Sequence, residues 1–192
     1  MLEMARRVLI TGFGPFANHP INASSETLKE LTKELVMEGI EFDFKELGVI
    51  YGNTKDFISS YWKTKSPLFC VHLGVYTEKF VSVECQCNET VYTLKDVEEK
   101  TPEDGKWLFI ESAFPLQKIV QTLSQKTLPV PIRLSKDAGQ YLCQYSYHNS
   151  LCSGNGRSVF VHVPKLEDSP AKNTAVVVTA IIKELVDSLS QD

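Results

Sequence analysis

Short apolar runs alternate with amphipathic segments along almost the whole chain, and this alternation restricts the possible folds more than any other feature. The runs predicted to form strands cover residues 7–11, 40–50, 68–75, 79–87, 128–134 and 158–163. Helix-like spacing of apolar residues fills most of the intervals, at 24–38, 52–66, 115–123, 143–151 and 175–189. Strand–helix–strand connections favour parallel strands with helices on both faces. We therefore predict one α/β domain over residues 1–192, a three-layer sandwich around a mostly parallel, twisted sheet.

The first predicted helix carries start and stop signals. Either Ser24 or Ser25 is a suitable N-terminal cap, and Gly39 is expected to end the helix. Its predicted buried stripe consists of Leu28, Leu31, Leu35 and Val36. By the same rules, Pro115 is expected at the start of a later helix.

Composition argues against several classes of function. The net charge of −4, with both signs mixed, argues against nucleic-acid binding. No apolar run is long enough to cross a bilayer and Met1–Arg7 does not resemble a signal peptide, so we predict a cytoplasmic protein that binds no membrane. Five cysteines, an odd number, predict free thiols in such a chain. Cys70 and Cys152 are expected to be small buried residues, and the spacing of Cys85 and Cys87 does not fit a zinc site.

The stretch from Ser135 to Cys143 is the strongest candidate for catalytic chemistry. It follows the apolar run 128–134 and leads into helical spacing, which places Cys143 in the first turn or two of a helix. The unpaired N–H groups and the positive end of the dipole at a helix start favour a thiolate. Further along, His162 lies on the predicted strand 158–163. A cysteine and a histidine on neighbouring strand ends would be a nucleophile and its base.

Such a pair needs a third group that orients the imidazole and stabilises its charged form. Glu84 and Glu78 are the acids best placed by sequence. Glu84 follows a β-branched apolar run, where an acid is unusual unless it has a partner. It could instead lie on an exposed edge, and spacing alone leaves both possibilities open.

Two phenylalanines lie in a segment that directly follows the first predicted strand. Residues 12–22 contain two glycines and two prolines, which exclude regular structure, and they include Phe13 and Phe16. Open α/β sheets bind ligands at the C-terminal ends of their strands. These rings therefore either contact a ligand or close the edge of the core.

Two other regions have a structural and a functional interpretation. His72 lies within the apolar run 68–75 and is expected to be a hydrogen-bonded core residue rather than a site residue. The acidic segment Asn88–Trp107 is the least regular part of the chain. We expect it to be an excursion that covers or flanks the site, or a surface loop.

Three blocks of sequence together resemble the pyroglutamyl-peptidase I family of cysteine peptidases. The blocks are Val8–Phe16 with Asn22–Ser24, Ser135–Cys143, and Phe160–Pro164, and Val71–Val75 is similar to the family's third strand. Their order and separation match as well. One block would be weak support, but the combination is specific.

The resemblance implies hydrolysis of the peptide bond that follows an N-terminal pyroglutamyl (5-oxoproline) residue. It implies that Cys143 is the nucleophile, His162 the general base and Glu84 the acid of the triad. The implied substrate-binding residues are Phe13 and Phe16 around the lactam ring, Asn22 beside it, and Tyr141 and Leu142 before the nucleophile. Aromatic faces suit a small, flat, neutral ring. The resemblance implies no metal and no cofactor, and its partners are small peptides with N-terminal pyroglutamate.

One departure from the family's pattern concerns an arginine. The family usually has one near the active site in the segment after the triad acid, whereas Cys85–Lys95 contains none. Lysine does not replace the planar, two-pronged donor of arginine. This departure leaves reduced activity or altered specificity as an alternative to full activity, and it leaves the choice between Glu84 and Glu78 open.

Three functions therefore remain open from sequence. The first is an active peptidase, and the second is a weak or inactive homologue that binds pyroglutamyl peptides. The third is a redox-sensing thiol protein, which would need a resolving cysteine near Cys143. The sequence does not distinguish a monomer from a homo-oligomer.

Overall fold

Six strands form one sheet in the order β2-β1-β3-β8-β4-β7 in the computed structural model, which describes residues 6–16, 20–102 and 107–189. The strands are β1 (Arg7–Phe13), β2 (Glu41–Leu47), β3 (Phe69–Val75), β4 (Val81–Glu84), β7 (Ile132–Ser135) and β8 (Ser158–Val163). A small second sheet pairs β5 (Gln86–Cys87) with β6 (Ile110–Glu111). The central strands β3 and β8 are buried on both faces, as their continuous apolar runs predict.

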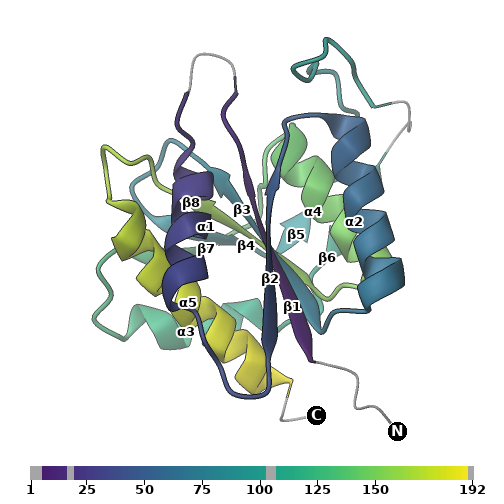
Figure 1. Ribbon diagram of the computed structural model, residues 1–192. Helices are drawn as coiled ribbons and strands as arrows, with labels where there is room; N and C mark the ends of the chain where they lie inside the picture. The colour runs from purple at the N-terminus through teal and green to yellow at the C-terminus, as the bar shows by residue number, and fades with distance from the viewer. Residues whose placement is uncertain (1–5, 17–19, 103–106, 190–192) are drawn as a thin grey trace, which may run out of the picture.

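Helices cover both faces of the large sheet. They are α1 (Ala23–Glu34), α2 (Tyr51–Lys65), α3 (Leu116–Ser124), α4 (Leu142–Ser153) and α5 (Ala171–Ser188). Helices α1, α3 and α5 lie on one side of the sheet and α2 and α4 on the other (Figure 1). The predicted three-layer α/β architecture is confirmed.

Two strands run against the rest of the sheet. Strand β4 is antiparallel to β8, and β7 is parallel to β4. The predicted strand 79–87 divides into β4 and β5, separated by Cys85. Strand β7 begins at Ile132 rather than at Leu128, and it forms the edge of the sheet. Apolar periodicity gives the faces of a strand but not its direction, so these reversals were not predictable from it.

The first helix differs from its prediction at both ends. Asn22 is the cap, because its Oδ1 accepts the Ser24 N–H at 3.0 Å, and the helix begins at Ala23. Ser24 instead bonds back to β1, where its Oγ accepts the Phe13 N–H at 3.0 Å. The helix ends at Glu34, before Gly39, which adopts a φ of 72° in the following turn. Val36 was expected in the buried stripe but is 83% exposed.

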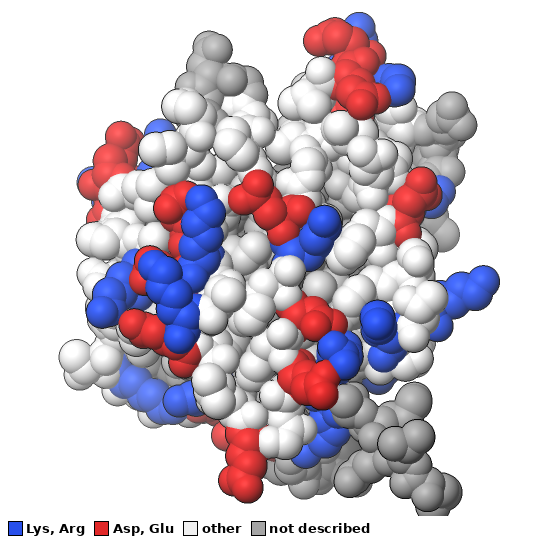
Figure 2. Space-filling model, in the orientation of Figure 1, with Lys and Arg blue, Asp and Glu red and all other residues white. Residues whose placement is uncertain are grey.

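The surface carries mixed charge on the face seen in Figure 2, where basic and acidic side chains lie next to one another. Pairs of this kind include Lys29–Glu26 at 2.7 Å and Lys33–Glu30 at 2.6 Å. Among the described residues, no helix is both long and apolar enough to span a membrane.

Candidate active site

Cys143 is the second residue of α4, so its predicted position in the first helical turn is confirmed. No side chain in the described part of the chain caps this helix start, which leaves backbone N–H groups of the first turn available to a ligand. The route by which the chain reaches this position was predicted wrongly. Strand β7 does not neighbour β8, because β4 lies between them, and residues 136–141 connect the end of β7 to the helix.

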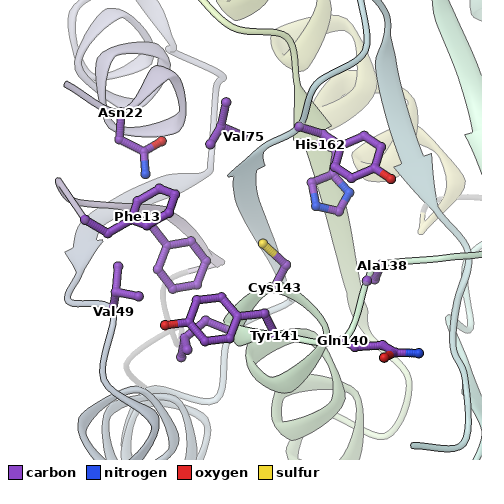
Figure 3. A pocket seen from close by; sticks show the side chains of 13 residues that line it. Phe13, Asn22, Val49, Val75, Ala138, Gln140, Tyr141, Cys143 and His162 are labelled. Atoms are coloured by element: carbon purple, nitrogen blue, oxygen red, sulfur yellow. The ribbon is translucent and has the colours of Figure 1, made fainter. Parts of the chain in front are cut away.

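The register of β8 against its neighbouring strands places His162 close to Cys143. His162 lies opposite Gly74 of β3 on one side and opposite Ser82 of β4 on the other. A Cβ atom at Gly74 would lie 2.9 Å from Cys143 Sγ and 2.7 Å from the Phe160 ring. Glycine is therefore required here so that the sulfur can approach the sheet beside the imidazole, as Figure 3 shows for Cys143 and His162.

Glu84 is the third side chain of the site, beside His162. It stands two residues along β4 from Ser82, so its side chain is the diagonal neighbour of His162 on the same face. Glu84 Oε1 lies 2.8 Å from His162 Nδ1, and Oε2 accepts the Asp137 N–H at 3.2 Å. The Glu84 side chain is 1% exposed, so the exposed-edge alternative is wrong.

The environment of His162 favours its charged form. Burial lowers the pKa of the imidazole, but interactions with Cys143 and then with Glu84 outweigh burial and raise the pKa to about 9. Because Nδ1 faces Glu84, the other ring nitrogen, Nε2, is left for the thiol. The arrangement can accept a proton from Cys143 and return it to a leaving group.

Glu78, the alternative acid, lies elsewhere. Its carboxylate forms an ion pair with Arg133, and its side chain is 35% exposed. Arg133 also donates from Nε to Ser82 Oγ at 2.9 Å, on the strand that carries Glu84. The Glu78 carboxylate is thus engaged at the surface, whereas the Glu84 carboxylate contacts the histidine.

A cavity of about 280 Å³ opens beside the sulfur. Phe13, Asn22 and Val49 line one side, facing Cys143 and His162 across it (Figure 3). The other lining residues are Phe16, Val75, Tyr76, Ala138, Gly139, Gln140, Tyr141 and Leu142. All five predicted substrate-binding residues therefore come together around this cavity.

The structural roles of these five residues differ. Phe13 is not in a loop as predicted but is the last residue of β1, and it is 4% exposed. The Asn22 side chain already holds the chain in place, because its Nδ2 donates to the Gly14 carbonyl at 3.0 Å in addition to its capping bond. Leu142 is 2% exposed, and Tyr141 donates its hydroxyl to the Lys95 carbonyl at 3.1 Å.

Asp96 anchors the excursion after β5 to the start of α2. The Asp96 carboxylate accepts backbone N–H groups of Tyr51, Glu98 and Lys100 at 3.0, 2.9 and 3.1 Å. Tyr51 is the first residue of α2, so the acid also satisfies a helix start. The Lys95 carbonyl also accepts the hydroxyl of Tyr141, which lines the cavity, so the excursion contacts the cavity wall there. Residues 103–106 lie outside the described part of the chain.

The structure adds site residues that spacing did not identify. The Tyr76 ring lies 5.1 Å from the His162 ring, measured between centroids, and it borders the cavity. Tyr76 directly follows β3, so the rule that ligands bind at strand ends could have indicated it. Gly74, a glycine within an apolar strand, was a second usable signal.

His72 belongs to the core, as predicted, although only one of its nitrogens is paired. Its Nδ1 lies 2.7 Å from Thr11 Oγ1, whereas Nε2 is buried with no partner among the described residues. Burial lowers its pKa to about 3, so the ring is neutral. Of the two cysteines expected to be buried, Cys70 is, but Cys152 is exposed.

Charged ligand-binding groups are few around this site. Among the described residues, no cluster of three or more His, Cys, Asp or Glu side chains could hold a metal ion. No lysine or arginine is among the described residues that line the cavity. Lys95, the only basic residue in the segment that lacks the family's arginine, pairs with Glu99 at 3.3 Å. The described lining of the cavity therefore presents mainly uncharged side chains beside the Cys143 sulfur and the His162 ring.

Comparison with known proteins agrees with this geometry. Residues 6–190 match the family described as pyroglutamyl peptidase. The chain is 33% identical to human pyroglutamyl-peptidase 1 over 199 residues, covering 100% of this chain and 95% of that protein. Pyrrolidone-carboxylate peptidase of Pyrococcus furiosus is 29% identical over 84% of this chain and 82% of that protein. The solved structure of pyrrolidone carboxyl peptidase from Thermococcus litoralis has the same fold, with a TM-score of 0.86, 21% identity and coverage of 97% and 96% of the two chains.

Proposed function

This chain belongs to the pyroglutamyl peptidase family, and we propose that it is a cysteine peptidase that removes N-terminal pyroglutamyl residues from small peptides. The observation that carries the proposal is the contact chain from Cys143 through His162 to Glu84 at the edge of an apolar cavity. Each member supplies what covalent acyl transfer needs: a nucleophile, a base within reach, and an acid that orients the base.

The proposed reaction begins when His162 takes the proton from the Cys143 thiol. The sulfur attacks the pyroglutamyl carbonyl carbon, and the carbonyl electrons move onto the oxygen. Backbone N–H groups at the uncapped start of α4 stabilise that oxyanion. When the oxyanion collapses, the C–N bond breaks and His162 gives its proton to the departing nitrogen, leaving a thioester. Water, deprotonated by His162, then releases pyroglutamate and regenerates the thiol.

The cavity suits the lactam ring. A pyroglutamyl group is flat, small and uncharged, so it can enter an apolar cavity without leaving a buried charge unpaired. Phe13 and Phe16 offer aromatic surface, and Asn22 keeps one amide hydrogen beyond its bond to Gly14. A free N-terminal glutamate, which carries both a carboxylate and an ammonium group, would find no described basic side chain in the lining.

We also propose the domain, the compartment and the binding partners of this reaction. The whole chain acts as one catalytic domain in the cytoplasm, and its binding partners are the peptide substrates. All five cysteines are free, which suits a reducing compartment. The proposed chemistry needs no cofactor, because the three side chains and water account for every proton and electron pair.

The test is release of a fluorophore from a pyroglutamyl amide by the natural chain and by Cys143→Ala. We expect turnover that the substitution abolishes. A folded natural chain that binds a pyroglutamyl analogue but releases no fluorophore would instead support the alternative, an inactive homologue that binds pyroglutamyl peptides. The absence of the family's arginine makes this comparison informative.

A further inference from the structure

A second cavity, of about 370 Å³, lies next to the first. The two share four lining residues: Phe16, Asn22, Val75 and Tyr76. The second cavity extends away from the sulfur over Thr77, which follows β3, and over residues 165–167, which follow β8. It is therefore built on the ends of the same two strands that carry Gly74 and His162.

Its position relative to His162 identifies the part of a substrate that would reach it. Tyr76, shared by both cavities, contacts the His162 ring, with 5.1 Å between the ring centroids and 41° between the ring planes. In the proposed reaction His162 protonates the departing nitrogen, so that nitrogen must lie on the His162 side of the sulfur. The side chain that follows pyroglutamate then leaves the first cavity past Tyr76, toward the second.

The lining of the second cavity is mainly apolar. Three of its large apolar side chains are exposed: Ile21 by 60%, Tyr76 by 46% and Leu166 by 37%. Exposed apolar side chains gathered in one cavity are typical of a binding surface. The only charged residues in the described lining are Lys165 and Glu167, whose side chains lie 3.6 Å apart and offset each other. The cavity therefore offers apolar contact without a net charge.

We infer that this second cavity, lined by Tyr76, Thr77 and Leu166, binds the side chain of the residue after pyroglutamate and selects apolar side chains there. The inference rests on the proposed function. Burying part of an aliphatic or aromatic side chain against this surface should favour it over an acidic one by about tenfold in kcat/KM.

A competition assay tests the inference. Equimolar pyroglutamyl peptides that differ only in the second residue (Leu, Asp or Lys) are mixed in one reaction, so that the product ratio gives the ratio of kcat/KM values directly. Leu166→Glu and Leu166→Lys place opposite charges at the cavity. Val36→Glu and Val36→Lys are matched controls, because Val36 is 83% exposed and lies outside both cavities.

The natural chain should cleave the Leu peptide about tenfold faster than the Asp peptide. The Lys-to-Asp product ratio should rise about threefold in Leu166→Glu and fall about threefold in Leu166→Lys, with no change in the Val36 variants. Equal ratios in both Leu166 variants, or equal shifts in the Val36 variants, would overturn the inference while leaving the proposed function intact. Cleavage of none of the peptides by the folded natural chain would overturn the proposed function instead.

Discussion

Replacing Glu84 by glutamine removes one acceptor from a carboxylate that serves two donors. Oε1 faces His162 Nδ1 at 2.8 Å, and Oε2 accepts the Asp137 N–H at 3.2 Å. A glutamine offers one acceptor oxygen and one donor nitrogen. If its oxygen turns to Asp137, its amide donates to Nδ1 and forces the proton onto Nε2, the nitrogen that must accept from Cys143. If its oxygen turns to His162, the Asp137 N–H loses Glu84 and keeps only Ser135 Oγ, at 3.3 Å, as its acceptor.

The expected losses of activity and of stability follow from these contacts. A wrong tautomer removes the base, which should lower kcat/KM on a pyroglutamyl fluorogenic amide by between about 10² and 10⁴ at pH 7. Loss of the charged hydrogen bond between the buried side chains of Glu84 and His162 should lower the free energy of unfolding by about 1–3 kcal/mol. Steady-state kinetics and urea unfolding measure both quantities on the same variant.

Stability should also depend on pH in a defined direction. The pKa of His162 is raised from 6.5 to about 9, so the stabilisation of its charged form is complete below about pH 6.5 and is lost as pH rises through about 9. The stability difference between the natural chain and Glu84→Gln should therefore be larger at pH 6 than above pH 9.

Glu78→Gln is the matched control, because Glu78 pairs with Arg133 at the surface. It should keep activity within about threefold of the natural chain, since exposed ion pairs contribute little. Full activity in Glu84→Gln together with loss of activity in Glu78→Gln would refute the assignment of the acid.

Three further predictions concern Gly74, Asp96 and the reactivity of Cys143. Gly74→Ala should abolish activity and destabilise the fold by about 1–3 kcal/mol, because the new Cβ would lie 2.9 Å from Cys143 Sγ; Gly52→Ala, with no atom within 4 Å, should retain full activity on the fluorogenic amide. Asp96→Asn should weaken the attachment of the excursion to α2, and with it the contact between Lys95 and the cavity residue Tyr141. We expect KM to rise more than kcat falls, and an unchanged KM in steady-state kinetics would contradict a positioning role for Asp96. Iodoacetamide should inactivate the chain at Cys143, and a pyroglutamyl analogue should protect it; peptide mapping should show that labelling of the exposed Cys152 is unaffected by the analogue.

Much of the fold could be predicted because its signals are local. The continuous apolar runs of β3 and β8 identified central strands, and helical spacing after residue 142 placed Cys143 in the first turn of α4. The reversed direction of β4 follows from its short link to β3, residues 76–80, which is too short for a parallel crossover, and the direction of β7 follows from its pairing with β4; periodicity encodes neither. For the same reason, a strand-end argument alone gave the wrong path to Cys143.

Fewer of the contacts in the site could be predicted, because they join residues far apart in the sequence. Glu84 and His162 are 78 positions apart, and placement along the sequence left Glu84 and Glu78 as alternatives between which only the family resemblance chose before the structure did. The cap of α1 was missed because Asn22 and Ser24 are both good caps, and the bond from the Phe13 N–H to Ser24 decided between them. Tyr76 was missed because its role depends on a ring contact with His162 across two strands.

The identity of the acylated residue tests the proposed mechanism most directly. A pyroglutamyl ester or amide is mixed with the chain, the reaction is quenched in acid, and the digested protein is examined by mass spectrometry. We expect a pyroglutamyl thioester on the peptide that contains Cys143, formed during turnover and absent from Cys143→Ala. Turnover that survives in Cys143→Ala, or an acyl group found on another residue, would contradict that mechanism.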